Sequence, residues 1–363
     1  MDFFSIGFTE VEKQIMNDNR INYRKQLNDF LSEARKRAKG TKCYYCGKPV
    51  TSFCDSHYVP RFCLKNIAVD GKVYYCISFT DFELMDVDQG VKQAGTFNII
   101  CRECDSKIFQ DYENPDSYPS VPSSKMLAEI AMKDYLKFIY KRRLEKAMGD
   151  ITIEKNPPFG LYIKLKAEVQ ELDLIEYDKN FQKAKQLSQQ DQNVGYELFF
   201  YQQLPYVSPV AMQSCIDLIA DLDGQCVNNT FDISPDYHPR DLHLSILPLS
   251  DSTVIMMFVD SNEDVYKSFI KQFKEKTLDE QLGIINYIVF LYTEDYFISP
   301  SVPKEVFENA SIEDSVAQLA EGLSIGDNRE EAQERALKNA LITFDLRKWR
   351  KVPNLLDEQY RVC

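Results

Sequence analysis

The chain has 363 residues, of which 44% are hydrophobic and 27% are charged, and its formal net charge is −13. This length suits two domains, and the composition is that of an ordinary soluble globular protein. The longest apolar runs are much shorter than the roughly 18 consecutive apolar residues that a membrane span needs. The first residues lack the basic and apolar regions of a signal peptide, so we expect a cytoplasmic protein with no membrane segment.

The negative charge is concentrated in the C-terminal part. Residues 1–150 carry 23 Lys and Arg against 21 Asp and Glu, whereas residues 151–363 carry 20 against 35. Within 20–48, nine basic residues stand against two acidic ones, an excess that suits either phosphate binding or a solvated helix face. The acidic part is poorly suited to nucleic acid, so we expect a protein partner or self-association there.

The N-terminal part is predicted to begin with a polar helix over 9–38, capped by Thr9 and ended by Gly40. Three strand-like runs and a short helix are then expected, at 48–60, 70–79, 90–100 and 104–113. A Pro- and Ser-rich loop leads into a strong amphipathic helix over 124–148. We therefore expect residues 1–150 to form a helical arm, a strand–strand–helix module and a following helix.

The C-terminal part, 151–363, is predicted to be an acidic α+β domain. Residues 161–169 alternate between apolar and polar, which is typical of a half-buried strand, and 241–260 have the pattern of a hairpin. Helices are expected at 263–275, 278–297 and 327–345. The chain has no phosphate-binding glycine loop and no serine-hydrolase elbow, so the nucleotide-binding and hydrolase classes that depend on them are not indicated.

Four of the ten cysteines form two Cys-x-x-Cys pairs, Cys43 with Cys46 and Cys101 with Cys104. Each pair can hold one metal ion from a tight turn, and four thiolates are the ligand set of structural zinc. The rival interpretations are two unrelated pairs or a redox pair. The other cysteines show no pairing logic and are expected to be free thiols: Cys54, Cys63, Cys76, Cys215, Cys226 and Cys363.

Three further residues lie at characteristic places around these pairs. His57 lies in the segment Ser-His-Tyr-Val-Pro, Asn98 lies three residues before Cys101, and Asp105 directly follows Cys104. In this order and spacing, residues 43–110 resemble the zinc-bound form of HNH endonucleases. The resemblance implies an α+β protein whose N-terminal module is a zinc-bound ββα, or treble-clef, fold.

The resemblance also implies an activity, the hydrolysis of phosphodiester bonds, in DNA more than in RNA. His57 would be the general base, because a neutral imidazole near pH 7 can deprotonate water. Asn98 would hold the loop that carries His57, and Asp105 would bind a catalytic Mg²⁺ or Mn²⁺ ion. The basic residues expected to contact phosphates are Arg35, Lys36, Arg37, Arg61, Arg102 and Lys107. Fused HNH-like modules of this kind often act as bacterial defence or toxin effectors.

The sequence also departs from the HNH pattern. The family commonly has Asp, Glu or His directly before the catalytic His, as a second metal ligand, whereas this chain has Ser56. A non-catalytic zinc module that binds nucleic acid or protein is therefore an alternative, and a purely structural zinc clamp is a third. His238 and His243, in the acidic part, are interpreted as structural.

Overall fold

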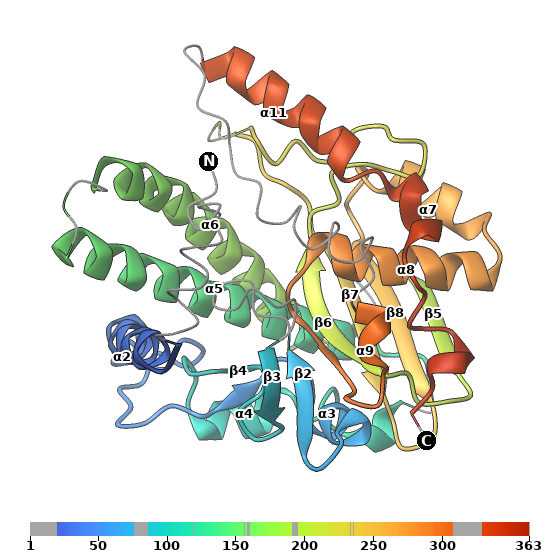
Figure 1. Ribbon diagram of the computed structural model, residues 1–363, viewed down its shortest axis with the longest axis horizontal. Helices are drawn as coiled ribbons and strands as arrows, with labels where there is room; N and C mark the ends of the chain where they lie inside the picture. The colour runs from blue at the N-terminus through green and yellow to red at the C-terminus, as the bar shows by residue number, and fades with distance from the viewer. Residues whose placement is uncertain are drawn as a thin grey trace.

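The computed structural model describes residues 20–75, 86–118, 120–155, 157, 160–190, 195–232, 234, 236–307 and 329–362. Mixed helix and sheet agree with the predicted α+β class. Figure 1 shows a long antiparallel pair of helices, α5 and α6, projecting from a large sheet, with the N-terminal elements gathered beside α5. Among the residues that the structure describes, no helix is both long enough and apolar enough to cross a bilayer.

The N-terminal part consists of short elements and one longer helix. Its elements are α2 (Arg20–Ala38), β1 (Ser56–His57), α3 (Arg61–Ile67), β2 (Lys72–Tyr75), β3 (Asp86–Gly90), β4 (Thr96–Phe97) and α4 (Arg102–Ile108), followed by the 3-10 turn η1 (Pro115–Ser117). The predicted helix at 9–38 is confirmed from Arg20 onwards, and residues 9–19 lie outside the described residues. The predicted strands at 48–60 and 90–100 are wrong in extent, because only 56–57 of the first and 90 and 96–97 of the second lie in strands.

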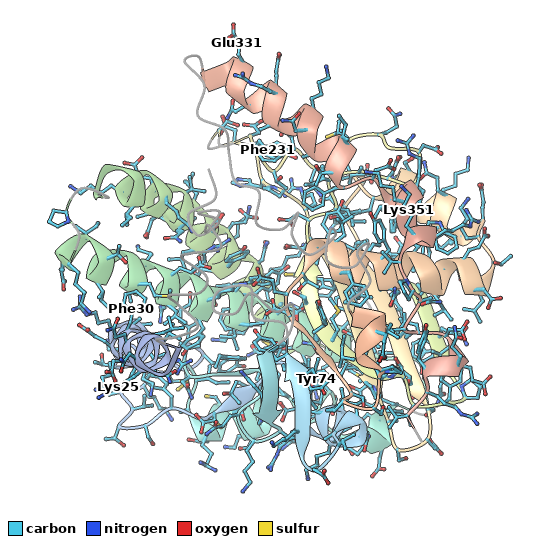
Figure 2. All side chains as sticks on the ribbon, in the orientation of Figure 1. Lys25, Phe30, Tyr74, Phe231, Glu331 and Lys351 are labelled. Atoms are coloured by element: carbon cyan, nitrogen blue, oxygen red, sulfur yellow. The ribbon has the colours of Figure 1, made fainter. Side chains whose placement is uncertain are left out.

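The apolar side of α2 packs against the far end of α5. Ala34 and Ala38 form a small buried cluster with Ala147 and Ile151, and Phe30 packs against it. Figure 2 shows Phe30 and Lys25 on this helix, at the edge of the molecule. The contact fixes the basic C-terminal end of α2 close to the cysteine segment.

Helices α5 (Ser124–Lys155) and α6 (Gly160–Leu187) differ from the predicted helix at 124–148 and the predicted strand at 161–169. Gly149 does not end α5; an added Cβ there would lie 2.9 Å from Ile163 Cγ2, so the glycine allows the two helices to approach closely. The predicted strand at 161–169 is wrong, because these residues form the first turns of α6. Leu, Lys, Ala and Glu favour a helix, and packing against α5 outweighs the alternating pattern.

The sheet has seven strands in the order β3-β2-β9-β6-β7-β8-β5, and every neighbouring pair is antiparallel. The C-terminal strands are β5 (Tyr196–Leu204), β6 (Val210–Ile216), β7 (Leu242–Pro248), β8 (Thr253–Asp260) and β9 (Tyr296–Ile298). The predicted hairpin at 241–260 is confirmed, with Pro248 opposite Thr253. Strands β2 and β3 come from the N-terminal part, and α5 runs unbroken through residue 150, so both parts of the chain contribute to one architecture.

The remaining helices lie along the other side of the sheet and at the end of the chain. They are α7 (Lys267–Lys274), α8 (Leu278–Tyr292), α9 (Lys304–Phe307) and α11 (Arg329–Thr343), with the 3-10 turns η3 (Leu346–Lys351) and η4 (Glu358–Tyr360). The predicted helix at 278–297 ends at Tyr292, because residues 296–298 pair as β9. Thr277 and Glu280 form a capping box that begins α8.

Alternation along the central strands separates two cores. On β8, Ile255, Met257 and Val259 face the core of α7 and α8, whereas Met256 and Phe258 face α5 and the cysteine module. This is the two-residue period of a strand that is buried on both faces. The sheet face beneath α5 therefore lies inside the molecule, and any polar residue on it needs a partner there.

Candidate metal centre and the ionic cluster beside it

The four cysteines of the two pairs come together at one point. The sulfur atoms of Cys43, Cys46, Cys101 and Cys104 all lie within 4.8 Å of one another. The cluster joins the turn before β1 to the start of α4, across more than 50 residues of chain. Four converging sulfurs can hold a metal ion such as zinc, and this confirms that the two pairs belong to one site.

Backbone hydrogen bonds shape the first turn of this four-cysteine site. The Gly47 N–H donates to the Cys43 carbonyl at 2.8 Å, and Gly47 has a φ of +71°, which favours glycine. The Cys101 N–H donates to Cys43 Sγ at 3.3 Å, so the second pair also supports a sulfur of the first. Such N–H···S contacts stabilise thiolates and fit a bound cation.

The thiols would not ionise together without a cation. Burial, together with hydrogen bonds from Cys101 and Cys46, raises the pKa of the Cys104 thiol well above its usual value. A metal ion reverses this preference, because it supplies the positive charge that four thiolates require. The ligand set therefore fits zinc, and zinc binding is expected to release protons.

The two residues of strand β1 point to opposite sides. Ser56 is buried and its hydroxyl contacts Asp105 Oδ1 at 2.5 Å. The ring of His57 faces the other way, with Nε2 3.0 Å from the Val91 carbonyl oxygen. Because a carbonyl only accepts, Nε2 carries the proton and Nδ1 is the unprotonated nitrogen of the neutral ring.

Burial lowers the pKa of His57, and the positive charges of Lys133 and Arg61 act in the same direction against the Val91 hydrogen bond. His57 is therefore neutral near pH 7. Asn98 contacts the segment that leads into His57. Its amide donates to the Cys54 carbonyl at 3.1 Å and to Asp55 Oδ1 at 2.5 Å.

Asp105 is held by a lysine that the sequence analysis did not single out. Lys133, on α5, is fully buried, and its ammonium group donates to Asp105 Oδ1 at 3.2 Å, Glu113 Oε1 at 2.8 Å and Ser56 Oγ at 2.8 Å. Its Nζ also lies 3.8 Å from the centroid of the Phe109 ring. We refer to Ser56, Asp105, Glu113 and Lys133 as the lysine cluster.

The two carboxylates of the lysine cluster respond differently to the shared ammonium. Burial tends to raise the pKa of both carboxyl groups. In Asp105 the charge of Lys133 and the hydrogen bond from the Ser56 hydroxyl outweigh burial and lower the pKa. In Glu113 burial outweighs Lys133 and raises the pKa. Asp105 is thus the more firmly ionised partner, and it is already satisfied by hydrogen bonds from the chain.

Two groups of three or more potential metal ligands occur among the described residues. One is the four-cysteine site, and the other lies beneath α5 on the sheet. Neither contains His57 or Asp105. In the structure Asp105 contacts Ser56 and Lys133, whereas His57 contacts Val91. Among the described residues, His57 and Asp105 do not belong to a common group of three potential metal ligands.

The basic residues that were expected to contact phosphates are exposed: Arg35, Lys36, Arg37, Arg61, Arg102 and Lys107. Arg37 is paired with Glu33 and Glu154, and Lys107 is paired with Glu103. A cavity of about 370 Å³ adjoins the four-cysteine site and is lined by Lys48, Lys107 and Lys125 among others. Glu103 also lines this cavity and Lys125 is paired with Asp111, so the charge beside the cysteine turns is mixed.

The sequence did contain a signal for the lysine cluster. The segment Met132-Lys133-Asp134-Tyr135 interrupts the most apolar part of α5, and all four residues are buried. Charged residues are almost never fully buried unless they are paired, so adjacent charges inside an apolar helix predict buried partners. Which partners they meet depended on segments far away in the chain.

Comparison with known proteins gives no match: no family model, curated protein or solved structure matches this sequence.

Proposed function

We propose that the N-terminal part is a zinc-organised module of the HNH-like, treble-clef kind that binds the phosphate backbone of nucleic acid without hydrolysing it. Three features agree with the ββα expectation. Strands β1 and β4 pair antiparallel, α4 follows them, and the four-cysteine site lies at their base.

The observation that carries the proposal is the position of Lys133. In an HNH-type nuclease the divalent ion is expected near the residue before the His and the residue after the second cysteine pair. These are Ser56 and Asp105 in this chain, where the family commonly has Asp, Glu or His at the first position and His or Asn at the second. The Lys133 ammonium contacts both of these residues and is itself fully buried. A fixed ammonium provides the charge that a divalent ion would provide, but it offers no open coordination position to water or phosphate.

The choice of nucleic acid as partner rests on the distribution of charge. Residues 20–75 carry twelve basic residues against four acidic ones, which are Asp29, Glu33, Asp55 and Asp70. Every basic side chain of this segment whose exposure the structure describes is exposed, from Lys25 to Lys72. Basic groups near a rigid zinc site can replace the counterions of a polyphosphate backbone.

A second candidate is the nuclease activity itself, and one observation favours it. The neutral His57 ring has its Nε2 on the Val91 carbonyl and its Nδ1 unprotonated, which is the state that a general base needs. Under this alternative, Lys133 would have to leave Asp105 when a metal ion binds. The burial of Lys133 and its three hydrogen bonds count against such a movement.

The proposal can be tested by fluorescence anisotropy with labelled double- and single-stranded DNA and RNA over a range of salt concentrations. We expect the logarithm of the association constant to fall linearly with the logarithm of the salt concentration. The triple variant Arg35→Gln/Lys36→Gln/Arg102→Gln should reduce the slope by up to about 3, because each lost phosphate contact contributes about 0.9.

The matched control is Lys271→Gln/Lys274→Gln/Lys276→Gln, which removes three exposed charges around α7. We expect this control to keep the wild-type slope. An equal reduction of the slope in the two triple variants would contradict the proposal. So would the absence of binding by the wild type to all four probes.

A further inference from the structure

A second polar cluster lies between α5 and the sheet. Asp134 of α5, Cys215 of β6 and His243 of β7 are all buried, with exposed fractions of 2% or less for Asp134 and His243 and 5% for Cys215. Cys215 and His243 are directly opposite each other in the antiparallel pairing of β6 and β7. One ligand atom from each of the three residues lies within 4.8 Å of the other two. We refer to these three residues as the sheet-face cluster.

Both ring nitrogens of His243 face oxygen atoms. Nε2 lies 3.3 Å from the Tyr135 hydroxyl, and that hydroxyl donates its only hydrogen to Asp241 Oδ2 at 2.8 Å. With Asp241 ionised, the proton on this side is on Nε2; burial raises the pKa of Asp241, and a protonated Asp241 would instead let the Tyr135 hydroxyl donate to Nε2. With the proton on Nε2, Nδ1 presents its lone pair to Asp134 Oδ2 at 2.8 Å unless it too is protonated.

Two acceptors that face each other in a buried place need a cation or a proton between them. The other oxygen of Asp134 already accepts from Gln213 Nε2 at 3.0 Å, so it provides no proton donor for Nδ1. Lys137, one turn further along α5, is paired with Asp295 at 3.0 Å. Lys183, which lines a small cavity beside His243, is paired with Asp260. Among the described residues no lysine or arginine is paired with Asp134, so the place between Nδ1 and Asp134 Oδ2 is filled either by a proton on His243 or by a metal ion.

The three side chains form a ligand set that zinc prefers. Zinc binds Cys sulfur, His nitrogen and carboxylate oxygen, and in sites with three protein ligands it keeps a fourth position open. The outer contacts also fit, because a metal-bound His usually donates its other N–H onwards and a ligating carboxylate is itself hydrogen-bonded. Here Tyr135 takes the His243 N–H, Gln213 holds Asp134, and the Phe258 ring stacks on His243 at 4.5 Å.

Two buried polar atoms lie beside the cluster without a hydrogen-bond partner in the described part of the chain, and a small cavity adjoins one of its residues. The cavity, of about 50 Å³, is lined by Tyr135, Asp241 and His243 among others, and by neither Asp134 nor Cys215. On the same sheet face, Gln213 Oε1 and Ser245 Oγ are buried without a hydrogen-bond partner among the described residues. Such orphaned atoms indicate a bound water or ion that completes the network.

We propose that Asp134, Cys215 and His243 bind a second zinc ion, separate from the four-cysteine site. Binding would displace the Cys215 thiol proton and any proton on His243 Nδ1 to solvent, and it would require no oxidant or other reactant. This inference does not depend on the nucleic-acid proposal.

The test is a count of zinc ions in the full-length protein, purified with zinc present and freed of loosely bound metal. Elemental analysis should find two zinc ions per chain. X-ray absorption should give an average number of sulfur ligands per zinc well below four, because one ion would have four thiolates and the other only one. One zinc per chain with four sulfur ligands would overturn the proposal without the use of any variant.

Two substitutions assign the second ion. Cys215→Ser should lower the content to one zinc per chain, and Asp134→Asn serves the same purpose if the serine variant does not fold. Cys63→Ser is the matched control, because Cys63 is a fully buried thiol that belongs to neither group of potential metal ligands. The Cys63→Ser variant should retain two zinc ions per chain. A folded Cys215→Ser or Asp134→Asn variant that still holds two zinc ions would also overturn the assignment.

Discussion

Two neighbouring residues of α5, Lys133 and Asp134, occupy opposite kinds of buried site. Lys133 faces the cysteine module and brings a positive charge to two carboxylates, whereas Asp134 faces the sheet and brings a negative charge to a His and a Cys. In the lysine cluster the chain supplies its own cation. In the sheet-face cluster no lysine or arginine is paired with Asp134 among the described residues, and we propose that a zinc ion balances it. Two consecutive residues of one helix would then serve an internal cation and a metal ion.

The largest effect that bears on this comparison is expected from loss of the zinc in the four-cysteine site. Zinc binding in such sites contributes on the order of 10 kcal/mol to folding. Cys46→Ser should therefore unfold β1, β4 and α4, while β7 and β8 keep the core that they share with α8. Hydrogen exchange would show loss of protection at 43–58 and 95–108 but not at 242–260. Unchanged protection at 43–58 would contradict a structural zinc.

The next largest effect is expected when the cation of the lysine cluster is removed. Lys133→Gln keeps most of the side-chain volume but leaves Asp105 and Glu113 without a positive partner, so we expect a loss of about 3–5 kcal/mol in the free energy of unfolding. Mg²⁺ or Mn²⁺ should restore part of this loss, because the vacated oxygens are suitable ligands for hard cations. Denaturant unfolding with and without each ion measures both effects.

The control for this variant is Lys107→Gln. Lys107 forms an exposed ion pair with Glu103, and its removal should change neither stability nor the response to divalent ions. A Lys133 variant that behaved like this control would show that the buried ammonium is not what balances the two carboxylates.

A smaller effect concerns Glu129, which is also on α5. Its side chain is 1% exposed, and burial raises its pKa to about 7 despite the hydrogen bond from the Tyr112 N–H. The native state thus holds a proton that the unfolded chain releases near its usual pKa of 4.5. Stability from this group is present at low pH and is lost as the pH rises from 4.5 through 7, by on the order of 3 kcal/mol.

Glu129→Gln should remove this pH dependence, because an amide does not titrate. We expect the variant to be more stable than the wild type at pH 8 and similar to it at pH 4, as measured by urea unfolding. Parallel pH profiles for the two proteins would show that Glu129 is ionised in the native state.

The smallest effect is expected for His57→Ala. The substitution removes one hydrogen bond to Val91 and should cost about 1 kcal/mol at pH 8. The difference should shrink as the pH falls below about 6.5, because the native state resists protonation of His57 while the unfolded chain does not. A difference that grows on acidification would mean that His57 is charged in the native state.

Local patterns in the sequence predicted the parts of the structure that depend on neighbouring residues. The Cys-x-x-Cys spacing predicted the four-cysteine cluster, and the run from Leu242 to Asp260 predicted the central hairpin. The strand predicted at 161–169 was wrong because the alternating pattern competes with helix propensity, and packing against α5 decided between them. Here tertiary contacts outweighed a local signal.

The two ionic clusters could not be predicted, because each joins distant segments. Lys133 meets Ser56 from 77 residues away, and His243 meets Asp134 from 109 residues away. No local period encodes such meetings. The only signal was the presence of Lys133 and Asp134 in an apolar stretch of helix, which indicated partners without identifying them.

The central claim is that the N-terminal module binds nucleic acid but lacks a hydrolytic ion. Its most direct test is to incubate supercoiled plasmid with the full-length protein and Mg²⁺ or Mn²⁺. Mobility shift and strand breakage are read from the same samples of wild type, His57→Ala and Lys133→Gln. The account predicts that the wild type shifts the plasmid and leaves it intact. Cleavage by the wild type that is lost in His57→Ala, with zinc content unchanged, would contradict it.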